Sequence, residues 1–183
     1  MRRSGGYSLV EVLVAMFVLA VGVLGAAATQ AVSMRMRHDS GLMSSAVRLA
    51  ATLGERMRAN PTAAEAYLFE FDAGAGAALA KPPAACFNGT SCTPGQLAAF
   101  DIHDMSQTLA SSFPGGRIRV CRDLQSWDAG RQSLQWDCTS GAGAPVVVKI
   151  GWRERADAGS GDSAEAVRDD APRVAMPVPE PGT

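Results

Sequence analysis

One carboxylate, Glu11, lies in a stretch of the chain that otherwise carries no charge. Residues 12–28 contain no charged or strongly polar side chain, so this stretch can enter a bilayer as a helix. A carboxylate inside such a segment costs about 2.5–3.5 kcal/mol at the centre of the membrane and less near its end. Charges within a membrane usually mark function, so Glu11 predicts a functional role and a partner.

A second group of side chains that could bind a metal or transfer a proton lies close together in the sequence: Asp101, His103 and Asp104. Such a group can form a metal site or an acid–base pair. We favour the alternative in which Asp101 caps a helix and His103 is exposed, and we interpret His38 as a solvated helix residue. The chain shows no nucleophile motif, phosphate loop or paired carboxylate site. We therefore expect a protein that is not an enzyme, without catalytic residues, metal or cofactor.

Four cysteines follow the apolar stretch: Cys86, Cys92, Cys121 and Cys138. An even number predicts two disulfides in an oxidising compartment. Zinc binding is the alternative, but five residues separate the first two cysteines, whereas zinc sites favour two to four, and no histidine is close by. Proximity along the chain pairs Cys86 with Cys92 and Cys121 with Cys138, which is one of three possible connectivities.

Composition and charge narrow the class of protein. A length of 183 residues indicates one domain plus an anchor. The net charge of −1 points neither to nucleic acid nor to an acidic substrate, and basic residues interleaved with aromatics are missing, so we expect no nucleic-acid partner. Arginines flank the apolar stretch on both sides, so their orientation signal is weak. The cysteines orient the N-terminus to the cytoplasm and the remainder outside.

A long helix must carry Glu11. The apolar stretch continues into a stripe of apolar residues at helical spacing, formed by Met43, Ala46, Ala50, Leu53 and Met57. Pro61 ends the pattern. The predicted helix, Ser8–Ala59, is apolar all round in its first half and amphipathic in its second, and is about 75–80 Å long. Gly22, Gly25 and Gly41 are positions where it could bend or pack closely on another helix.

Beyond the long helix, the patterns predict a small mixed domain. Residues Thr62–Phe71 could form a short helix capped by Thr62 and Glu65, and Asp72–Pro83 reads as a connector. Asn88-Gly89 predicts a tight turn between Cys86 and Cys92. A second helix is expected over Thr93–Ser112.

Alternating residues then predict three strands of an antiparallel sheet: Arg117–Cys121, Leu134–Cys138 and Pro145–Trp152. In this arrangement Cys121 and Cys138 lie on neighbouring strands, where a disulfide can form. Residues 156–170 are rich in Ala, Gly, Ser and Asp and predict a mobile loop. Arg173–Val178 can return as a last strand, and Pro177 would confine it to an edge. The expected fold class is therefore α+β.

Three common kinds of segment could account for the apolar stretch near the N-terminus: a secretory signal peptide, a signal anchor and a buried core helix. A secretory signal peptide could use Ala26–Ala28 as its cleavage site, but Glu11 interrupts the apolar core that such a peptide requires, and the apolar run is long. A simple signal anchor leaves Glu11 unexplained. A buried core helix seldom starts at residue 8 without a polar face.

The beginning of the chain resembles the class III signal of type IV prepilins. Gly6 occupies position −1, the aromatic Tyr7 position +1 and Glu11 position +5. The pattern is specific because it combines a glutamate at this offset, a leader of a few residues and an apolar run that starts after the cleavage point. Tyr7 stands where phenylalanine is usual, but it remains aromatic.

Further stretches are similar to minor pilins of the PilV family. Near the N-terminus these are residues 11–15 and 21–25, followed by Gln30. In the middle region the similar residues are Cys86, Cys92–Pro94, Leu97–Asp101 and Phe113–Gly116. The resemblance covers most of residues 1–154 and fades in the tail. Met105 stands where relatives often have tryptophan.

The resemblance implies a type IV pilin-like fold in which the long helix packs on the sheet. The implied regions are a leader (1–6), a membrane and filament-core half-helix (7–32), an amphipathic half-helix (33–60), a globular periplasmic part (61–155) and a flexible tail (156–183). Prepilin peptidase would cut between Gly6 and Tyr7 and N-methylate Tyr7. Glu11 would then pair with a mature amino terminus, that of a neighbouring subunit or its own.

The same resemblance implies where the protein acts and with what. It would leave the inner membrane, whose lipid surrounds its apolar helix, for the pilus tip, where it joins other minor pilins and the major pilin to prime assembly. A minor pseudopilin of type II secretion is the alternative, because it uses the same leader chemistry. The four cysteines and the element Phe113–Gly116 favour the pilus.

Overall fold

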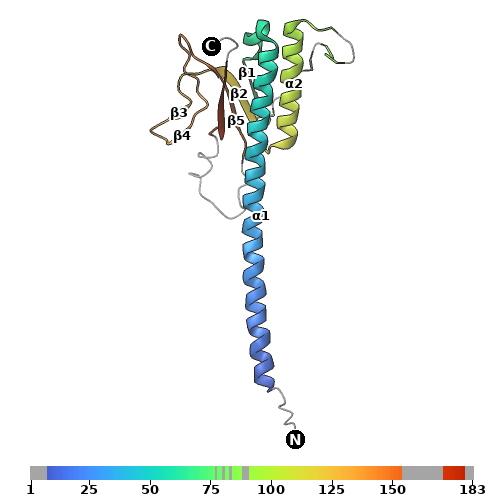
Figure 1. Ribbon diagram of the computed structural model, residues 1–183, viewed down its shortest axis with the longest axis vertical. Helices are drawn as coiled ribbons and strands as arrows, with labels where there is room; N and C mark the ends of the chain where they lie inside the picture. The colour runs from blue at the N-terminus through green and yellow to red at the C-terminus, as the bar shows by residue number, and fades with distance from the viewer. Residues whose placement is uncertain are drawn as a thin grey trace. The chain divides into compact units, whose positions relative to one another are not determined.

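A computed structural model describes residues 8–76, 78–79, 81–82, 84–87, 91–153 and 171–179. The chain divides into two compact units, Met1–Leu42 and Met43–Thr183, and we call the described residues of the second unit the head. The elements, labelled in Figure 1, are α1 (Leu9–Ala59), η1 (Pro61–Tyr67), β1 (Phe69–Asp72), α2 (Pro94–Ser112), β2 (Arg117–Arg122), β3 (Trp127–Asp128), β4 (Ser133–Leu134), β5 (Val146–Gly151) and β6 (Val174–Val178).

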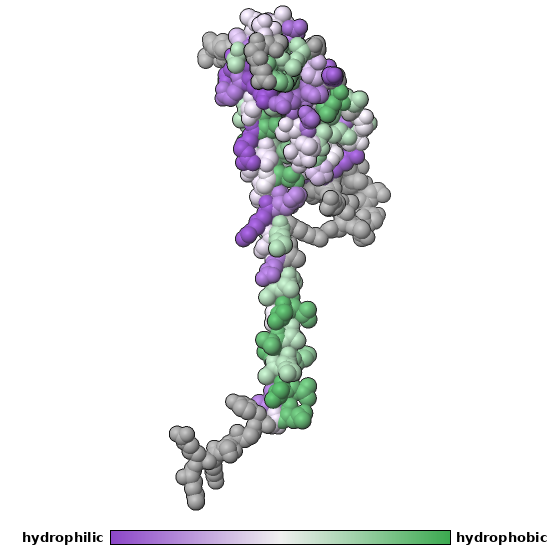
Figure 2. Space-filling view, turned by 90° about the vertical axis from the view of Figure 1, so that its right-hand side faces the viewer, coloured by the Kyte–Doolittle hydropathy of each residue, from purple (hydrophilic) through white to green (hydrophobic). Residues whose placement is uncertain are grey.

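The first unit is the N-terminal part of α1. This helix holds an 18-residue window with a mean hydropathy of 2.6, long and apolar enough to cross a membrane, and none of the window is buried. Figure 2 shows hydrophobic residues covering this part of the helix. The helix continues without a break through Gly22, Gly25 and Gly41, and a Cβ added at any of them would meet nothing within 4 Å in the described structure. Burial therefore contradicts the core-helix interpretation of this segment.

The head contains the amphipathic part of α1. Four members of the predicted stripe, Ala46, Ala50, Leu53 and Met57, are buried, whereas Met43 is exposed. This part of the helix packs on the sheet: a Cβ at Gly54 would lie 3.6 Å from Val178 in β6. The predicted α+β fold, a long N-terminal helix packed on a small antiparallel sheet, is confirmed.

The main sheet has four antiparallel strands in the order β1-β2-β5-β6 (Figure 1). β5 is buried along its whole length because it is a central strand covered on both faces. In register, Cys121 of β2 lies opposite Val147 of β5. β6 is the edge strand that the sequence predicted, and Pro177 pairs with Val147 on its inner side.

The predicted strand Leu134–Cys138 is wrong. β4 covers only Ser133–Leu134 and pairs with β3 in a separate two-stranded sheet, so β2 pairs directly with β5. The carbonyls of Gln135 and Asp137 accept hydrogen bonds from Lys149 Nζ. The alternating residues of this segment thus belong to an extended chain that is not a strand. Its carbonyl groups accept hydrogen bonds from a lysine side chain and not from the backbone of a neighbouring strand.

The predicted helix Thr62–Phe71 is also wrong in its second half. A 3₁₀ helix ends at Tyr67, and the next residues form β1, which pairs Phe69 with Val120. No side chain caps the start of η1, which follows Asn60. Glu65, expected in a capping pair with Thr62, instead forms an ion pair of 2.5 Å with Arg122. Residues Phe69–Asp72 therefore form a strand because they pair with β2, although their local pattern favoured a helix.

Helix α2 confirms the second predicted helix. Thr93 and Gln96 form a capping box: Thr93 Oγ1 accepts from the Gln96 amide at 3.3 Å, and Gln96 Oε1 accepts from the Thr93 amide at 2.9 Å. Met105 and Leu109 are buried on the inner face. The helix ends at Ser112, where the Phe113 amide donates to Leu109 O. The predicted turn at Asn88-Gly89 and the predicted mobile loop 156–170 lie outside the described residues.

Candidate functional site

Glu11 lies in the first turn of α1, where the sequence placed it. Its amide donates to Ser8 O at 3.0 Å, so the helix is already established at this residue. The side chain is exposed and is flanked by the exposed Leu9, Val10 and Val12. A carboxylate near a helix N-terminus is favoured by the positive end of the helix dipole. Gly6 and Tyr7, predicted to flank the cleaved bond, lie outside the described residues.

The ionised side chain of Glu11 can act only as a hydrogen-bond acceptor and as an anion. An ionised carboxylate accepts hydrogen bonds and attracts a cation, but it donates nothing. Within the described residues we find no side chain paired with it. On a helix whose surroundings are apolar, a cation supplied by another group would be held strongly once water is excluded.

All four cysteines form disulfides in the head. Cys86 bonds to Cys92, with their Cα atoms 5.7 Å apart, and Cys121 bonds to Cys138, with their Cα atoms 6.4 Å apart. These are the pairs that proximity along the chain favoured. Cys121 belongs to β2, whereas Cys138 lies in the loop that follows β4, so the second bridge joins a strand to a loop and not two neighbouring strands.

The crowded polar residues of α2 act as a structural link. Arg56 of α1 donates to Asp101 Oδ1 at 2.9 Å and to Asp104 Oδ2 at 2.7 Å, and the hydroxyl of Tyr67 in η1 donates to Asp101 Oδ2 at 2.7 Å. Figure 1 shows α2 beside the C-terminal end of α1. The expectation that Asp101 caps a helix is wrong, since it is buried within α2. His103 is half-buried rather than exposed and has a contact of its own.

The environment of Tyr67 follows from that link. Burial raises the pKa of its hydroxyl to about 12; the hydrogen bond from Asn60 opposes the rise, and the Asp101 carboxylate adds to it. A phenol with such a pKa stays protonated and keeps donating to Asp101. The described residues contain no cluster of three potential metal ligands. The hydrogen bonds and ion pairs of this region join α1, η1 and α2.

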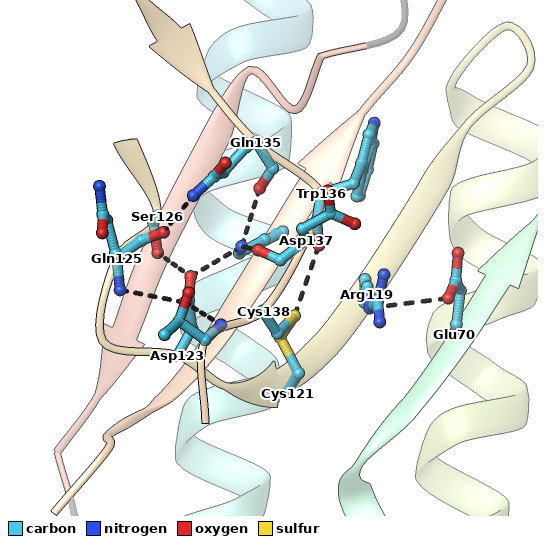
Figure 3. Close-up of a disulfide and its surroundings, with 12 residues drawn as sticks. Glu70, Arg119, Cys121, Asp123, Gln125, Ser126, Gln135, Trp136, Asp137 and Cys138 are labelled. Atoms are coloured by element: carbon cyan, nitrogen blue, oxygen red, sulfur yellow. Dashed lines mark hydrogen bonds and ion pairs between the residues drawn. A yellow bond between two sulfur atoms is a disulfide. The ribbon is translucent and has the colours of Figure 1, made fainter. Parts of the chain in front are cut away.

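The head contains a buried ion pair that the sequence patterns did not reveal. Lys149 of β5 lies 2.7 Å from Asp123 Oδ2, and both side chains have no exposed surface. Figure 3 shows Asp123 beside the disulfide of Cys121 and Cys138, with Ser126 directed at its carboxylate. A lysine inside the otherwise apolar run Val146–Ile150 was the signal that could have revealed it, because an unpaired lysine is almost never fully buried.

Hydrogen bonds keep the Asp123 carboxylate ionised. Burial by itself would raise its pKa, but hydrogen bonds from Lys149, Ser126 and the amides of Thr139 and Gln125 outweigh it and lower the pKa to about 2. The carboxylate is therefore charged at all physiological pH values. This pair is a structural element of the head, close to a disulfide and remote in sequence from Glu11.

Two family models match the chain. The model of the Tt1218-like family, type IV pilin Tt1218, matches residues 28–103, and the model of the prokaryotic N-terminal methylation motif matches residues 1–27. No curated protein and no solved structure matches the chain. Together the matches cover residues 1–103, from the start of the chain through α1 into α2, and with the observed fold they support a pilin-type subunit. Type IV pilins are structural subunits rather than enzymes.

Proposed function

We propose that the protein is a minor pilin of a type IV pilus, of the PilV kind, that primes pilus assembly together with other minor pilins and the major pilin. The observation that carries the proposal is one carboxylate, Glu11, in the first turn of an apolar helix whose surface is exposed. The match to the N-terminal methylation motif supports it, because the motif covers this carboxylate and the leader before it.

The first step of the proposed pathway is processing of the leader. Prepilin peptidase cuts between Gly6 and Tyr7, removes residues 1–6 and methylates the new amino group of Tyr7. Cleavage creates a cation four residues before Glu11. The chain itself thereby supplies a group of the charge that the Glu11 carboxylate needs.

The second step is insertion into the filament. The carboxylate of Glu11 pairs with the amino terminus of a neighbouring subunit as residues 7–32 pass from the inner membrane to the filament core. Removing one member of a buried ion pair costs about 3–5 kcal/mol, because it leaves the other charge uncompensated. A subunit without this carboxylate would therefore enter the filament poorly.

The remaining regions have supporting roles. The amphipathic half-helix, residues 33–60, carries the globular part (61–155) in the periplasm and later at the pilus tip. Two disulfides suit that compartment because the periplasm is oxidising. We propose no nucleic-acid partner and no cofactor for this subunit.

The test is mass spectrometry of the protein extracted from membranes, of the intact chain and of its N-terminal peptide, with and without reductant. The wild-type chain should begin at N-methylated Tyr7 and should be lighter than its reduced form by the hydrogens of two disulfides. In the variant Gly6→Ser the full-length precursor should remain in the inner membrane. The matched control Gly5→Ser, one residue earlier in the leader, should be processed.

Several results would contradict the proposal. A wild-type chain that begins after Ala28 would be a secreted protein released from a signal peptide, and an intact Met1 would indicate a plain signal anchor. Normal maturation of Gly6→Ser would remove the class III assignment. A deletion strain that keeps its pili but loses secreted proteins would assign the chain to type II secretion instead.

A further inference from the structure

The buried ion pair and the second disulfide close the same loop. The disulfide joins residues 17 apart, and the Thr139 amide donates to Asp123 Oδ1 at 2.8 Å across 16 residues. Asp123 follows Cys121 by two residues, and Thr139 follows Cys138 directly. The base of the loop between the two cysteines is thus closed twice, once by the disulfide and once by a hydrogen bond between Thr139 and Asp123.

Lys149 uses all its donors to hold this loop. Its ammonium group has three N–H donors, and they go to Asp123 Oδ2 at 2.7 Å, Gln135 O at 2.8 Å and Asp137 O at 2.7 Å. Gln135 and Asp137 come just before Cys138, whereas Asp123 comes just after Cys121. Figure 3 shows these acceptors around the disulfide. One side chain of β5 therefore binds both ends of the loop, the segment after Cys121 and the segment before Cys138.

Asp123 completes the closure from the other side. Its Oδ1 accepts from the amides of Gln125 at 3.0 Å and Thr139 at 2.8 Å, and its Oδ2 accepts from Ser126 Oγ at 2.7 Å as well as from Lys149. The Leu124 amide adds a bond of 2.9 Å to Thr139 O. Every lone-pair direction of the carboxylate is used, so this closure is well defined without the sulfur atoms.

The four-stranded sheet contains only one of the two cysteines. Cys121 lies in β2, whose pairing with β5 places Arg119 opposite Lys149. Cys138 lies in no strand. Formation of the sheet therefore brings Lys149 close to Cys121. The segment before Cys138 is held to the other side of the loop by the pairing of β3 with β4 and by the Gln135 amide, which donates to Ser126 O at 3.0 Å. Lys149 adds the bonds to Gln135 O and Asp137 O that tie this segment to β5. Forming these bonds requires no oxidant.

We propose that the ion pair of Lys149 and Asp123 closes this loop before its disulfide forms and thereby selects Cys138, among the three candidate thiols, as the partner of Cys121. Oxidation then occurs by exchange with a small disulfide such as oxidised glutathione. One cysteine thiolate attacks it and releases a glutathione thiolate, and the second cysteine displaces the other glutathione. Two protein thiols are oxidised, and one glutathione disulfide is reduced to two thiols.

The first test follows which cysteines pair. The full-length chain, reduced and unfolded, is diluted into detergent micelles with a glutathione redox buffer, trapped by alkylation and analysed by peptide mass spectrometry. The wild type should pair Cys121 almost wholly with Cys138. In Lys149→Met, whose unbranched side chain is one atom shorter and carries no charge, we expect the share of this pair to fall by up to about threefold, the limit set by equal shares of the three connectivities.

A control variant comes from the same loop. Arg131 forms an ion pair of 3.6 Å with Asp128, but its side chain is 80% exposed. Arg131→Met removes a positive charge from the loop without touching the buried pair, so it should pair its cysteines as the wild type does. If Lys149→Met gives native pairing at the wild-type rate and yield, the proposal is overturned.

A second test leaves Lys149 in place and removes the sulfur atoms. In the variant Cys121→Ser, Cys138→Ser the amides of Leu124 and Thr139 should remain protected from hydrogen exchange, because the ion pair still closes the loop. Exchange of both amides at the rate of an unstructured chain would overturn the proposal, whether or not the strands β2 and β5 stay protected. This result does not depend on whether Lys149→Met folds.

Discussion

Two sets of charged side chains, one in each unit of the chain, have opposite environments. In the first unit Glu11 is exposed on an apolar helix, and the described residues offer its carboxylate no partner. In the head Asp123 and Lys149 have no exposed surface, yet every donor and acceptor of the pair is used. The head is thus complete within one chain, whereas Glu11 needs a partner from elsewhere before it can leave water.

Apolar surface shows the same contrast along α1. The membrane-like window of the helix has no buried residue, while Ala46, Ala50 and Leu53 further along the same helix are fully buried. One helix therefore has a surface that lacks a partner within the described structure and another that the head already covers. Such an incomplete first unit is expected of a subunit that acts in a membrane and in an assembly.

The largest effect should come from Glu11→Ala. We expect processing and folding of the head to be unchanged, but the amount of the protein in sheared filaments should fall about 100-fold or more, since an uncompensated charge costs about 3–5 kcal/mol and each 1.4 kcal/mol is a factor of ten. Quantitative immunoblotting of filament and membrane fractions measures this ratio. Glu55→Ala, at an exposed glutamate of the head, is the control and should enter filaments normally. Wild-type amounts of Glu11→Ala in filaments would show that the carboxylate is dispensable.

Next in size is the effect of Lys149→Met on the head. Because Asp123 would stay buried without its cation, we expect the free energy of unfolding to fall by about 3–5 kcal/mol. Denaturant titration with tryptophan fluorescence measures it, since all three tryptophans lie beyond residue 120. Arg131→Met should change stability by less than about 0.5 kcal/mol. Equal stability of the two variants would mean that the head does not depend on its buried pair.

The disulfide variant Cys121→Ser should have a somewhat smaller effect. Closing a loop of about 15 residues adds about 3 kcal/mol in the chain-entropy model, and the loop between Cys121 and Cys138 is of this size. Denaturant titration under oxidising conditions should show this loss, and added reductant should bring the wild type to the same value. If thiol titration of the wild type found four free cysteines, the disulfides themselves would be refuted.

Acid should have the smallest effect of the four. The folded-state pKa of Asp123 is about 2, below its ordinary value of 3.8. A carboxyl whose pKa is lowered by folding stabilises the protein above its unfolded pKa, and this stability is lost as the pH falls through the folded pKa. We expect a loss of about 2 kcal/mol between pH 5 and pH 2. In Asp123→Asn this part of the pH profile should be absent; an unchanged profile would assign the acid sensitivity to other carboxyls.

Local patterns in the sequence determined much of this protein. The span of α1, the change from an apolar to an amphipathic surface, the span of α2 and the strands around Cys121 and Val148 all follow from side chains that are close together in the sequence. The place of Glu11 in the first turn of α1 was readable in the same way. These features depend on neighbours in the sequence, so no knowledge of the fold was needed.

Other features were decided only by the tertiary structure, because their partners are far apart in the sequence. Residues Phe69–Asp72 became a strand since β2 was available to pair with them. Asp101 became the partner of Arg56, 45 residues away, instead of a helix cap. The segment before Cys138 gave its carbonyls to Lys149 instead of to a strand. In each case a contact made after collapse outweighed a local preference of the order of 1 kcal/mol or less.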